Sequence, residues 1–274
     1  MIKIALGLPH TPWIPERVVS LERLMEQITT GDEPAKMRIF DERATNKVWP
    51  IKMWRWGLET GATHFLTLQD DVLVSPDFWP TLRAMIEANP LRILGLSAVH
   101  PLGPEMARQG HRWYRTKSWL VGWAYVLPRE DLAEFVGHVD ANPEEVAAKN
   151  EDQMLNDWIL ATGRDCWQPV PSPVDHDTSI ASTYSNDDHS HRRTTVTWRG
   201  YRREDLVSAD WWRSGPGPLL PLAWQSHCWA CGVRPAVIKT KETSVAICGQ
   251  CLGSLVGAVG ARLGGMLHGP GAAT

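Results

Sequence analysis

Two adjacent carboxylates, Asp70 and Asp71, follow an apolar run that contains Phe65, Leu66 and Leu68. This run is rich in strand-forming residues, and the carboxyl end of a buried strand is where open α/β sheets bind their ligands. Hard oxygen ligands at such a position suit Mg²⁺ or Mn²⁺, with phosphate oxygens completing the coordination shell. Asp is also a common turn residue, so the pair by itself is equally compatible with a structural turn.

A second pattern with clear chemistry is a set of paired cysteines near the C-terminus. Two C-x-x-C pairs, 16 residues apart, are formed by Cys228, Cys231, Cys248 and Cys251. This spacing is typical of a four-cysteine zinc site, and four thiolates leave no open coordination position, so the zinc is expected to be structural. Residues 233–247 alternate as a hairpin would, which predicts a zinc ribbon. Such thiols need a reducing compartment; disulfides in a secreted protein are the alternative.

Residues 68–78, Leu-Gln-Asp-Asp-Val-Leu-Val-Ser-Pro-Asp-Phe, resemble the acidic signature of nucleotide-sugar glycosyltransferases with the GT-A fold. In that family an Asp-x-Asp or Glu-Asp-Asp pattern precedes a hydrophobic strand and a helix start similar to Ser-Pro-Asp-Phe. A helix expected from residue 46 to Gly61 precedes the strand, which is also the family's order. The sequence departs from the family at Gln69, which can bond a ribose hydroxyl but is a poor metal ligand.

The resemblance implies roles for residues along the first 180 positions. A catalytic Mn²⁺ or Mg²⁺ would be held by Asp71 first, then by Asp70 and His176. Asp152, preferred over Glu151, would be the base that takes the proton from the acceptor hydroxyl, although acids in a first helical turn also have a complete structural explanation. Contacts with the donor, expected to be a UDP-sugar, are assigned to Pro9, His10, Thr11, Asn46, Lys47, Gln69, Asp70, Gly122 and Trp123. For residues 9–11 a structural turn is an equal alternative.

The distribution of charge along the chain suggests that the molecule accepting the sugar is a polyanion. Residues 1–183 carry 18 Lys and Arg against 25 Asp and Glu, a net charge of −7, whereas residues 184–274 carry 10 against 6, a net charge of +4. Arginines interleaved with aromatic residues suit phosphate contacts and base stacking. The residues assigned to nucleic-acid contact are Arg192, Arg193, Arg199, Arg202, Arg203, Trp211 and Trp212.

A zinc ribbon beside this basic segment makes the chain similar to the phage enzymes that glycosylate 5-hydroxymethylcytosine in DNA, in particular the group associated with methylcytosine-oxidising enzymes. DNA is therefore the expected acceptor. Two other readings stay open. One is a glycosyltransferase acting on a protein or a cell-envelope glycan, and the other is a non-enzymatic nucleic-acid-binding zinc protein. The donor sugar, the stereochemical outcome and the oligomeric state are open as well.

At 274 residues the chain can bury a full core and hold one large domain with an appendage. Residues 1–8 read as a first strand and not as a signal peptide, and no apolar run is long enough to span a membrane. The sequence thus predicts a cytoplasmic protein, in the host cytoplasm if phage-encoded, with no membrane partner.

The elements that must position these residues alternate between strand and helix, which favours an α/β fold with a mostly parallel, Rossmann-like sheet flanked by helices. We assign residues 1–210 to a GT-A-like domain, 222–256 to the zinc ribbon and 257–274 to a Gly/Ala-rich tail. Strands are expected at residues 2–8, 65–68, 91–98 and 118–127, helices at 16–28, 76–88 and from 128 and 150, and a polar loop at 101–117.

Overall fold

The computed structural model describes residues 1–29, 36–41, 49–99, 103–117, 122–144, 149–180, 194, 196–213, 215, 217–220, 238–239 and 246–247. The chain divides into two compact units, Met1–Leu220 and Pro221–Thr274. Residues 218–220 pair with Arg115 in the first unit, since the amide of Leu220 donates to the carbonyl of Arg115 at 2.7 Å.

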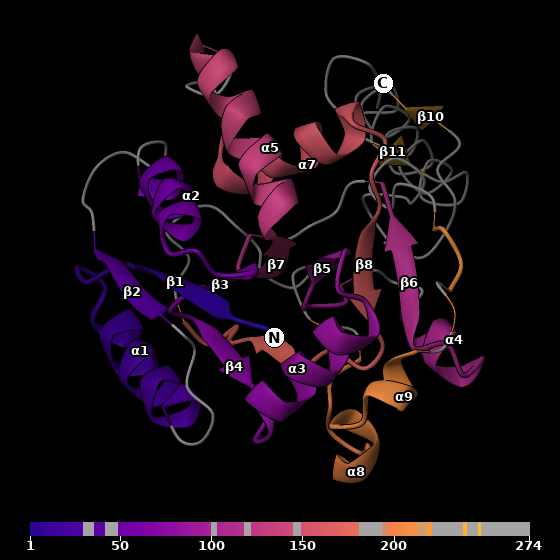
Figure 1. Ribbon diagram of the computed structural model, residues 1–274. Coiled ribbons are helices and arrows are strands. Elements are labelled where there is room, and N and C mark those ends of the chain that lie inside the picture. The colour runs from indigo at the N-terminus through magenta and orange to yellow at the C-terminus, as the bar shows by residue number, and fades with distance from the viewer. Residues whose placement is uncertain are drawn as a thin grey trace, which may run out of the picture. The chain divides into compact units, whose positions relative to one another are not determined.

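A seven-stranded sheet with the order β2-β1-β3-β7-β5-β8-β6 forms the centre of the first unit (Figure 1). β7 runs antiparallel to β3 and β5, and β6 runs antiparallel to β8, whereas the other neighbours are parallel. The strands are β1 (Ile4–His10), β2 (Lys36–Asp41), β3 (His64–Leu68), β5 (Ile93–Gly95), β6 (Trp113–Thr116), β7 (Ala124–Pro128) and β8 (Cys166–Pro169). This is the mixed α/β architecture, with a mostly parallel sheet, that the sequence predicts.

Helices cover both faces of this sheet (Figure 1). The central strands are buried on both sides, so successive side chains enter opposite halves of the core. In β3, Leu66 and Leu68 pack with α1 and α3, whereas Phe65 packs with α2, α5 and α7. The helices are α1 (Pro15–Ile28), α2 (Trp49–Glu59), α3 (Phe78–Ala88), α4 (Gly103–Arg108), α5 (Arg129–Ala141), α7 (Glu151–Ala161), α8 (Arg203–Leu206) and α9 (Ala209–Trp212).

A separate two-stranded ribbon continues from the acidic pair. β4 (Val72–Val74) pairs antiparallel with β9 (Val174–His176), and Val72 lies opposite His176 in the register. His176, which the resemblance assigns to the catalytic metal, is the last residue of this short strand. Antiparallel pairing with β4 therefore brings this imidazole next to the residue that precedes Val72, which is Asp71.

Several predicted boundaries differ from the structure. The first strand continues through His10, so Pro9 and His10 belong to β1 and not to a loop. The helix expected from residue 76 begins at Phe78 with Asp77 as its N-cap, and the hydroxyl of Ser75 caps nothing because it is buried without a hydrogen-bond partner among the described residues. The strand expected at 91–98 is limited to β5.

The predicted loop at residues 101–117 is wrong in its described part, since it contains α4 and β6. Trp113 and Tyr114 are fully buried there, and β6 forms the edge of the sheet beside β8. Polar and Arg residues around these two aromatics interrupt the hydropathy pattern and so hide the strand.

In the second unit, β10 (Ile238–Lys239) and β11 (Ala246–Ile247) pair antiparallel, as the alternating pattern of residues 233–247 predicts. The four cysteines and the tail at 257–274 lie outside the described residues, so the zinc ribbon stays a prediction.

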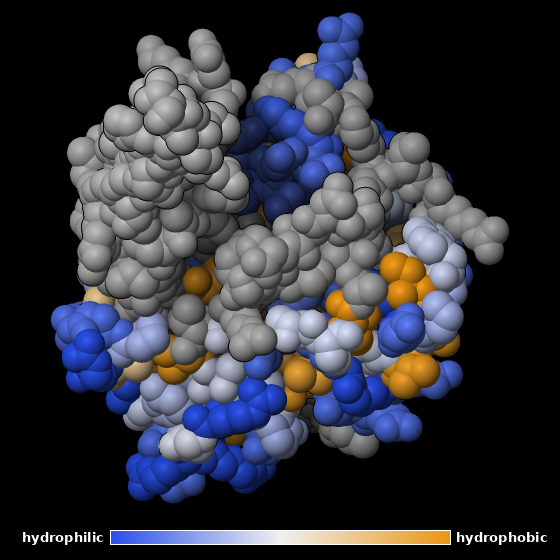
Figure 2. All heavy atoms as spheres, turned by 180° about the vertical axis from the view of Figure 1, so that it is seen from behind, coloured by the Kyte–Doolittle hydropathy of each residue, from blue (hydrophilic) through white to orange (hydrophobic). Residues whose placement is uncertain are grey.

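In the part of the chain that the structure describes, no helix combines the length and the apolar character needed to cross a membrane. On the face of the molecule seen in Figure 2, the described residues are mainly hydrophilic, with hydrophobic residues scattered between them. Scattered apolar side chains of this kind are ordinary for a protein surface.

Candidate functional site

The carboxylate of Asp70 is buried and fully engaged at the end of β3. Its Oδ2 accepts hydrogen bonds from the backbone amide of Thr11 at 2.7 Å and from Nδ1 of His10 at 2.9 Å. Its Oδ1 accepts from Nη1 of Arg17 at 2.5 Å. Because β1 and β3 are parallel, their carboxyl ends meet at one edge of the sheet, which explains why residues 10 and 11 reach this side chain.

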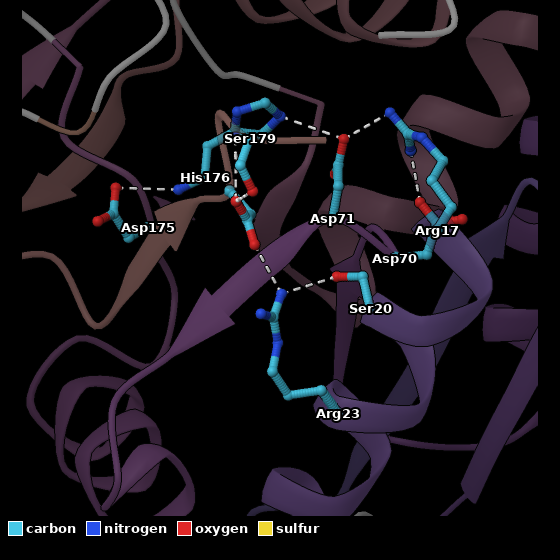
Figure 3. A network of polar contacts seen from close by, with 9 residues as sticks. Arg17, Ser20, Arg23, Asp70, Asp71, Asp175, His176 and Ser179 are labelled. Atoms are coloured by element: carbon cyan, nitrogen blue, oxygen red, sulfur yellow. Dashed lines mark hydrogen bonds and ion pairs between the residues drawn. The ribbon is translucent and has the colours of Figure 1, made fainter. Parts of the chain in front are cut away.

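Asp71 is equally buried, but only one of its two carboxylate oxygens has hydrogen-bond partners among the described residues. Its Oδ2 accepts from Nη2 of Arg17 at 2.5 Å and from Nε2 of His176 at 3.2 Å, a contact between residues 105 positions apart. Its Oδ1 is buried and has no hydrogen-bond partner among the described residues. Figure 3 shows Arg17 directed at both carboxylates from α1, with His176 on the opposite side of Asp71.

Arg17 is the charge that makes this pair of acids tolerable inside the protein. An isolated buried carboxylate is strongly unfavourable, and a planar guanidinium can serve two acceptors at once. Burial alone would raise the pKa of Asp71, but the hydrogen bond and charge of His176, together with the charge of Arg17, lower it below its ordinary value. Asp71 is therefore ionised in the folded protein at neutral pH.

The donor set fits a divalent cation in part. Oδ1 of Asp71 has no partner among the described residues, and Nε2 of His176 lies 3.2 Å from Oδ2 of the same carboxylate. A carboxylate and an imidazole suit Mn²⁺ or Mg²⁺. Both oxygens of Asp70 already accept hydrogen bonds, so Asp70 fits the metal role less well. In the described ranges no group of three His, Cys, Asp or Glu side chains is arranged to hold a metal. A cation here would thus have two protein ligands and need oxygens from a substrate.

The turn before β7 lies at the same edge of the sheet. β7 is antiparallel to β3, so its first residues meet the last residues of β3, and the amide of Gln69 donates to the carbonyl of Trp123 at 2.8 Å. The ring of Trp123 packs on that of His176, with centroids 4.8 Å apart. Its indole Nε1 is buried and has no hydrogen-bond partner in the described part of the chain. The structure thus brings Gln69, Trp123 and His176 together.

Gly122 lies beside the start of α7. A Cβ at this position would lie 3.5 Å from Cβ of Asp152, 3.7 Å from Nε2 of Gln69 and 3.8 Å from Oε2 of Glu151. These are ordinary contact distances, so an alanine would fit in contact with Gln69 and with both acids of α7. A glycine in or beside a strand often marks the close approach of a ligand or of another part of the backbone.

Glu151 and Asp152 have opposite environments although they are adjacent. Glu151 is buried, and its Oε1 accepts from the hydroxyl of Tyr125 at 2.7 Å, while that hydroxyl accepts from Nε1 of Trp54 at 2.8 Å. Burial, reinforced by the charge of Asp152, raises the pKa of Glu151 to about 8, against the opposing effect of the Tyr125 hydrogen bond. Asp152 is exposed to solvent. When two neighbouring carboxyls have different environments, one commonly acts as the acid and the other as the base of a reaction.

A capping box explains locally why these acids stand at a helix start. Asn150 is the N-cap of α7, and its backbone amide donates to Oε1 of Gln153 at 3.0 Å. Acids in this first turn also favour the helix dipole. The helix is thereby fixed at its N-terminus, which holds Glu151 and Asp152 in position next to Gly122.

The arginines assigned to nucleic-acid contact are partly described. Each of the three described ones is exposed and ion-paired: Arg199 with Asp175 at 3.0 Å, Arg202 with Asp205 at 2.9 Å, and Arg203 with Asp77 at 2.8 Å. Such surface pairs are weak, so a phosphate can replace the carboxylate. Arg192 and Arg193, like the donor candidates Asn46 and Lys47, lie outside the described residues.

The two tryptophans of the same segment differ. Trp212 is fully buried, packs on Trp113 with ring centroids 5.2 Å apart, and donates its indole hydrogen to the carbonyl of Leu206, so its ring is part of the core and not of an acceptor surface. Trp211 is half-buried, with the guanidinium of Arg112 3.3 Å above its ring.

Sequence reasoning missed Arg17 and the Tyr125–Glu151 contact. Arg17 lies in the first turn of an amphipathic helix, and an arginine there is ordinarily assigned to solvent. A signal was present, since Arg17, Ser20 and Arg23 recur at three-residue spacing and so share one face of α1. Arg23 donates to Oδ2 of Asp177, the residue after β9, at 2.7 Å.

The sequence matches no protein-family model and no curated protein. Among solved structures, the chain is similar to mannose-1-phosphate geranyltransferase from Thermus thermophilus, with 14% identity over 64% of this chain and 76% of that one, and a TM-score of 0.39. It is also similar to a glycosyltransferase involved in the glycosylation of the major capsid of PBCV-1, with 13% identity over 62% and 82% of the two chains and a TM-score of 0.35. Likenesses this slight do not identify a function, which has to be inferred from the site.

The buried Glu151 makes a pH dependence of stability testable. The carboxyl ionises near its ordinary value of 4.5 in the unfolded chain and at about 8 in the folded one. Between these pH values the folded state binds more protons, so the free energy of unfolding falls as pH rises. We expect Glu151→Gln, which keeps an acceptor for Tyr125, to remove this decline and to gain about 1–4 kcal/mol relative to wild type between pH 5 and pH 8 in urea melts.

Glu22→Gln, at an exposed glutamate of α1, is the matched control and should retain the wild-type decline with pH. A Glu151→Gln variant whose stability falls with pH as steeply as that of the wild type would show that Glu151 is not the buried acid responsible.

Proposed function

We propose that this chain is a glycosyltransferase that moves a sugar from a nucleotide-sugar, in the first instance a UDP-sugar, to a hydroxyl acceptor. The observation that carries the proposal is the convergence of four distant segments on the carboxyl end of β3. The acidic pair, the turn at Gly122 and Trp123, the start of α7 and His176 are linked there by contacts of 5 Å or less. Their order along the chain is the one that the GT-A resemblance implies.

The donor would lie over this edge of the sheet. Polar atoms without partners among the described residues, Nε1 of Trp123 and Oδ1 of Asp71, are available there to a ligand. When bound at Asp71 and His176, a divalent cation would neutralise charge on the departing nucleoside diphosphate. Gln69, whose side-chain amide lies near Gly122, is assigned to a donor hydroxyl.

The acceptor hydroxyl would approach Asp152 beside Gly122. Its oxygen forms the new bond to the anomeric carbon, the nucleoside diphosphate leaves with the electron pair of the broken bond, and the hydroxyl proton passes to Asp152. Glu151 is unsuited to this step at neutral pH, since its carboxyl already carries a proton when the pKa is about 8. Because Glu151 is protonated, it places no second negative charge next to Asp152.

Asp152→Asn tests the base. The substitution preserves the shape of the side chain and removes the proton acceptor, so UDP affinity should survive while the rate of sugar transfer in single-turnover assays falls about 10²–10⁴-fold. Glu151→Gln should keep most of the activity. If Glu151→Gln is inactive and Asp152→Asn is active, the two roles are reversed. If both variants keep full activity, the acids only stabilise the start of α7.

For the acceptor we propose 5-hydroxymethylcytosine in DNA. Three exposed arginines with weak surface partners, Arg199, Arg202 and Arg203, support it, and Arg199 is tied to Asp175, the neighbour of His176 in β9. A base stacked in a duplex cannot reach Asp152, so the enzyme must take it out of the stack or meet it unpaired, at a cost of a few kcal/mol. Phosphate contacts from these arginines would offset that cost.

The acceptor assignment is tested by offering hydroxymethylcytosine DNA with a panel of UDP-sugars and digesting the product to nucleosides for mass spectrometry. Glycosylated hydroxymethylcytidine should form, and Arg202→Glu/Arg203→Glu should lower the yield at least tenfold and weaken the dependence on salt. Arg55→Glu/Arg129→Glu makes the same charge change on α2 and α5, which cover the opposite face of the sheet, and should leave the yield unchanged.

Two other outcomes of these assays would favour the alternative functions. Transfer to a protein or cell-envelope glycan, with no product on DNA from any donor, would replace the DNA acceptor. Binding of DNA without turnover of any nucleotide-sugar, and without an effect of Mn²⁺, would make the chain a non-enzymatic nucleic-acid-binding protein.

We also propose that the four C-terminal cysteines hold one structural zinc. Metal analysis of the purified protein should give close to one zinc per chain, and Asp71→Ala should not change this ratio, because the two metals would have separate ligands. Cys231→Ser should lower the zinc content and unfold the second unit without loss of UDP binding. A disulfide at Cys228 or Cys251 in protein isolated under reducing conditions would contradict the zinc assignment.

A further inference from the structure

Arg17 contacts Oδ2 of Asp71, which is also the oxygen that His176 contacts. Nη2 of Arg17 and Nε2 of His176 both approach the same oxygen, Oδ2 of Asp71, at 2.5 and 3.2 Å. The second guanidinium nitrogen is held by Asp70 at 2.5 Å. Arg17 is buried with both acids, so solvent does little to screen its positive charge.

This arrangement goes beyond a structural ion pair because the guanidinium supplies what the cation would supply. It neutralises two adjacent carboxylates through one hydrogen bond to each, and hydrogen bonds between charged groups are stronger than those between neutral groups. A divalent cation that binds the same oxygen would meet a fixed positive charge in a poorly screened environment, and Asp71 would have to exchange one partner for the other.

We propose that Arg17 is a built-in counter-cation of the acidic pair, which competes with a divalent metal ion for Asp71 and keeps the metal affinity of the free enzyme low. The inference rests on the metal role of Asp71 and His176 in the proposed function, and it adds a residue that regulates that site. Arg17 acts here as a positioning residue, since it contacts the metal ligands and not the reacting atoms.

The substitution Arg17→Met tests this directly. It keeps much of the apolar stem and removes the charge, so Asp71 would be left with His176 alone. We expect Mn²⁺, titrated into the full chain and followed by the electron paramagnetic resonance of free Mn²⁺, to bind at least tenfold more tightly than to wild type. Mn²⁺ should also raise the melting temperature of Arg17→Met more than that of wild type, because the ion replaces the missing counter-charge.

Two matched variants separate the competition from general effects of charge. Arg23→Met removes an arginine from the same face of the same helix, but one paired with Asp177, and should bind Mn²⁺ as wild type does. Asp71→Asn combined with Arg17→Met should abolish the gain, which assigns the bound Mn²⁺ to this carboxylate.

Arg17→Lys covers the possibility that Arg17→Met does not fold. A lysine keeps the charge but cannot bridge two carboxylates in a planar fork, so the competition weakens and Mn²⁺ should bind several-fold more tightly than to wild type. Equal Mn²⁺ affinity in wild type, Arg17→Lys and any folded Arg17→Met overturns the inference while leaving the metal site intact. No Mn²⁺ binding to any of them overturns both the inference and the metal assignment, whereas the Asp152→Asn assay decides sugar transfer independently.

Discussion

The two buried carboxylates at the end of β3 are the constraint on which the site depends. Two adjacent negative charges can be removed from water only if each acquires donors or a counter-charge. Asp70 receives them from the end of β1 and from α1, and Asp71 receives them from α1 and from β9. Hydrogen bonds to this pair therefore fix three elements relative to β3, and among the described residues Arg17 is the side chain that bonds to both acids.

The direction of β7 places the second half of the site. Were β7 parallel to β3, the residues before it would lie at the far end of the sheet. Because it is antiparallel, the turn at Gly122 and Trp123 meets Gln69 and His176 at the same edge as the acidic pair. The site thus holds one pair of carboxylates that share the guanidinium of Arg17 and another in which Glu151 is neutral beside Asp152.

The parts of the fold that the sequence predicted are those with a local pattern. The amphipathic helix at 16–28 and the apolar strand at 65–68 match α1 and β3 within one residue, because burial on one face or on both leaves a regular period. β6 and β9 were missed because they are short and their partners, β8 and β4, lie far away in the sequence. Arg17 was missed because its partners are 53 and 54 residues distant. Its three-residue spacing with Ser20 and Arg23 indicates a shared face of α1, but not the acids that this face meets.

The basic character of residues 184–274 illustrates how far charge alone can specify a partner. Arg199 and Arg203 are paired with Asp175 and Asp77 from the acidic part of the chain, so the asymmetry seen in the sequence is partly cancelled in the folded first unit. A polyanion gains affinity there only by exchanging a carboxylate for a phosphate, and that exchange weakens with added salt. In the proposed reaction, electrostatics would hold a nucleic acid near the site, whereas the acceptor would be selected where its hydroxyl meets Asp152, beside Gly122.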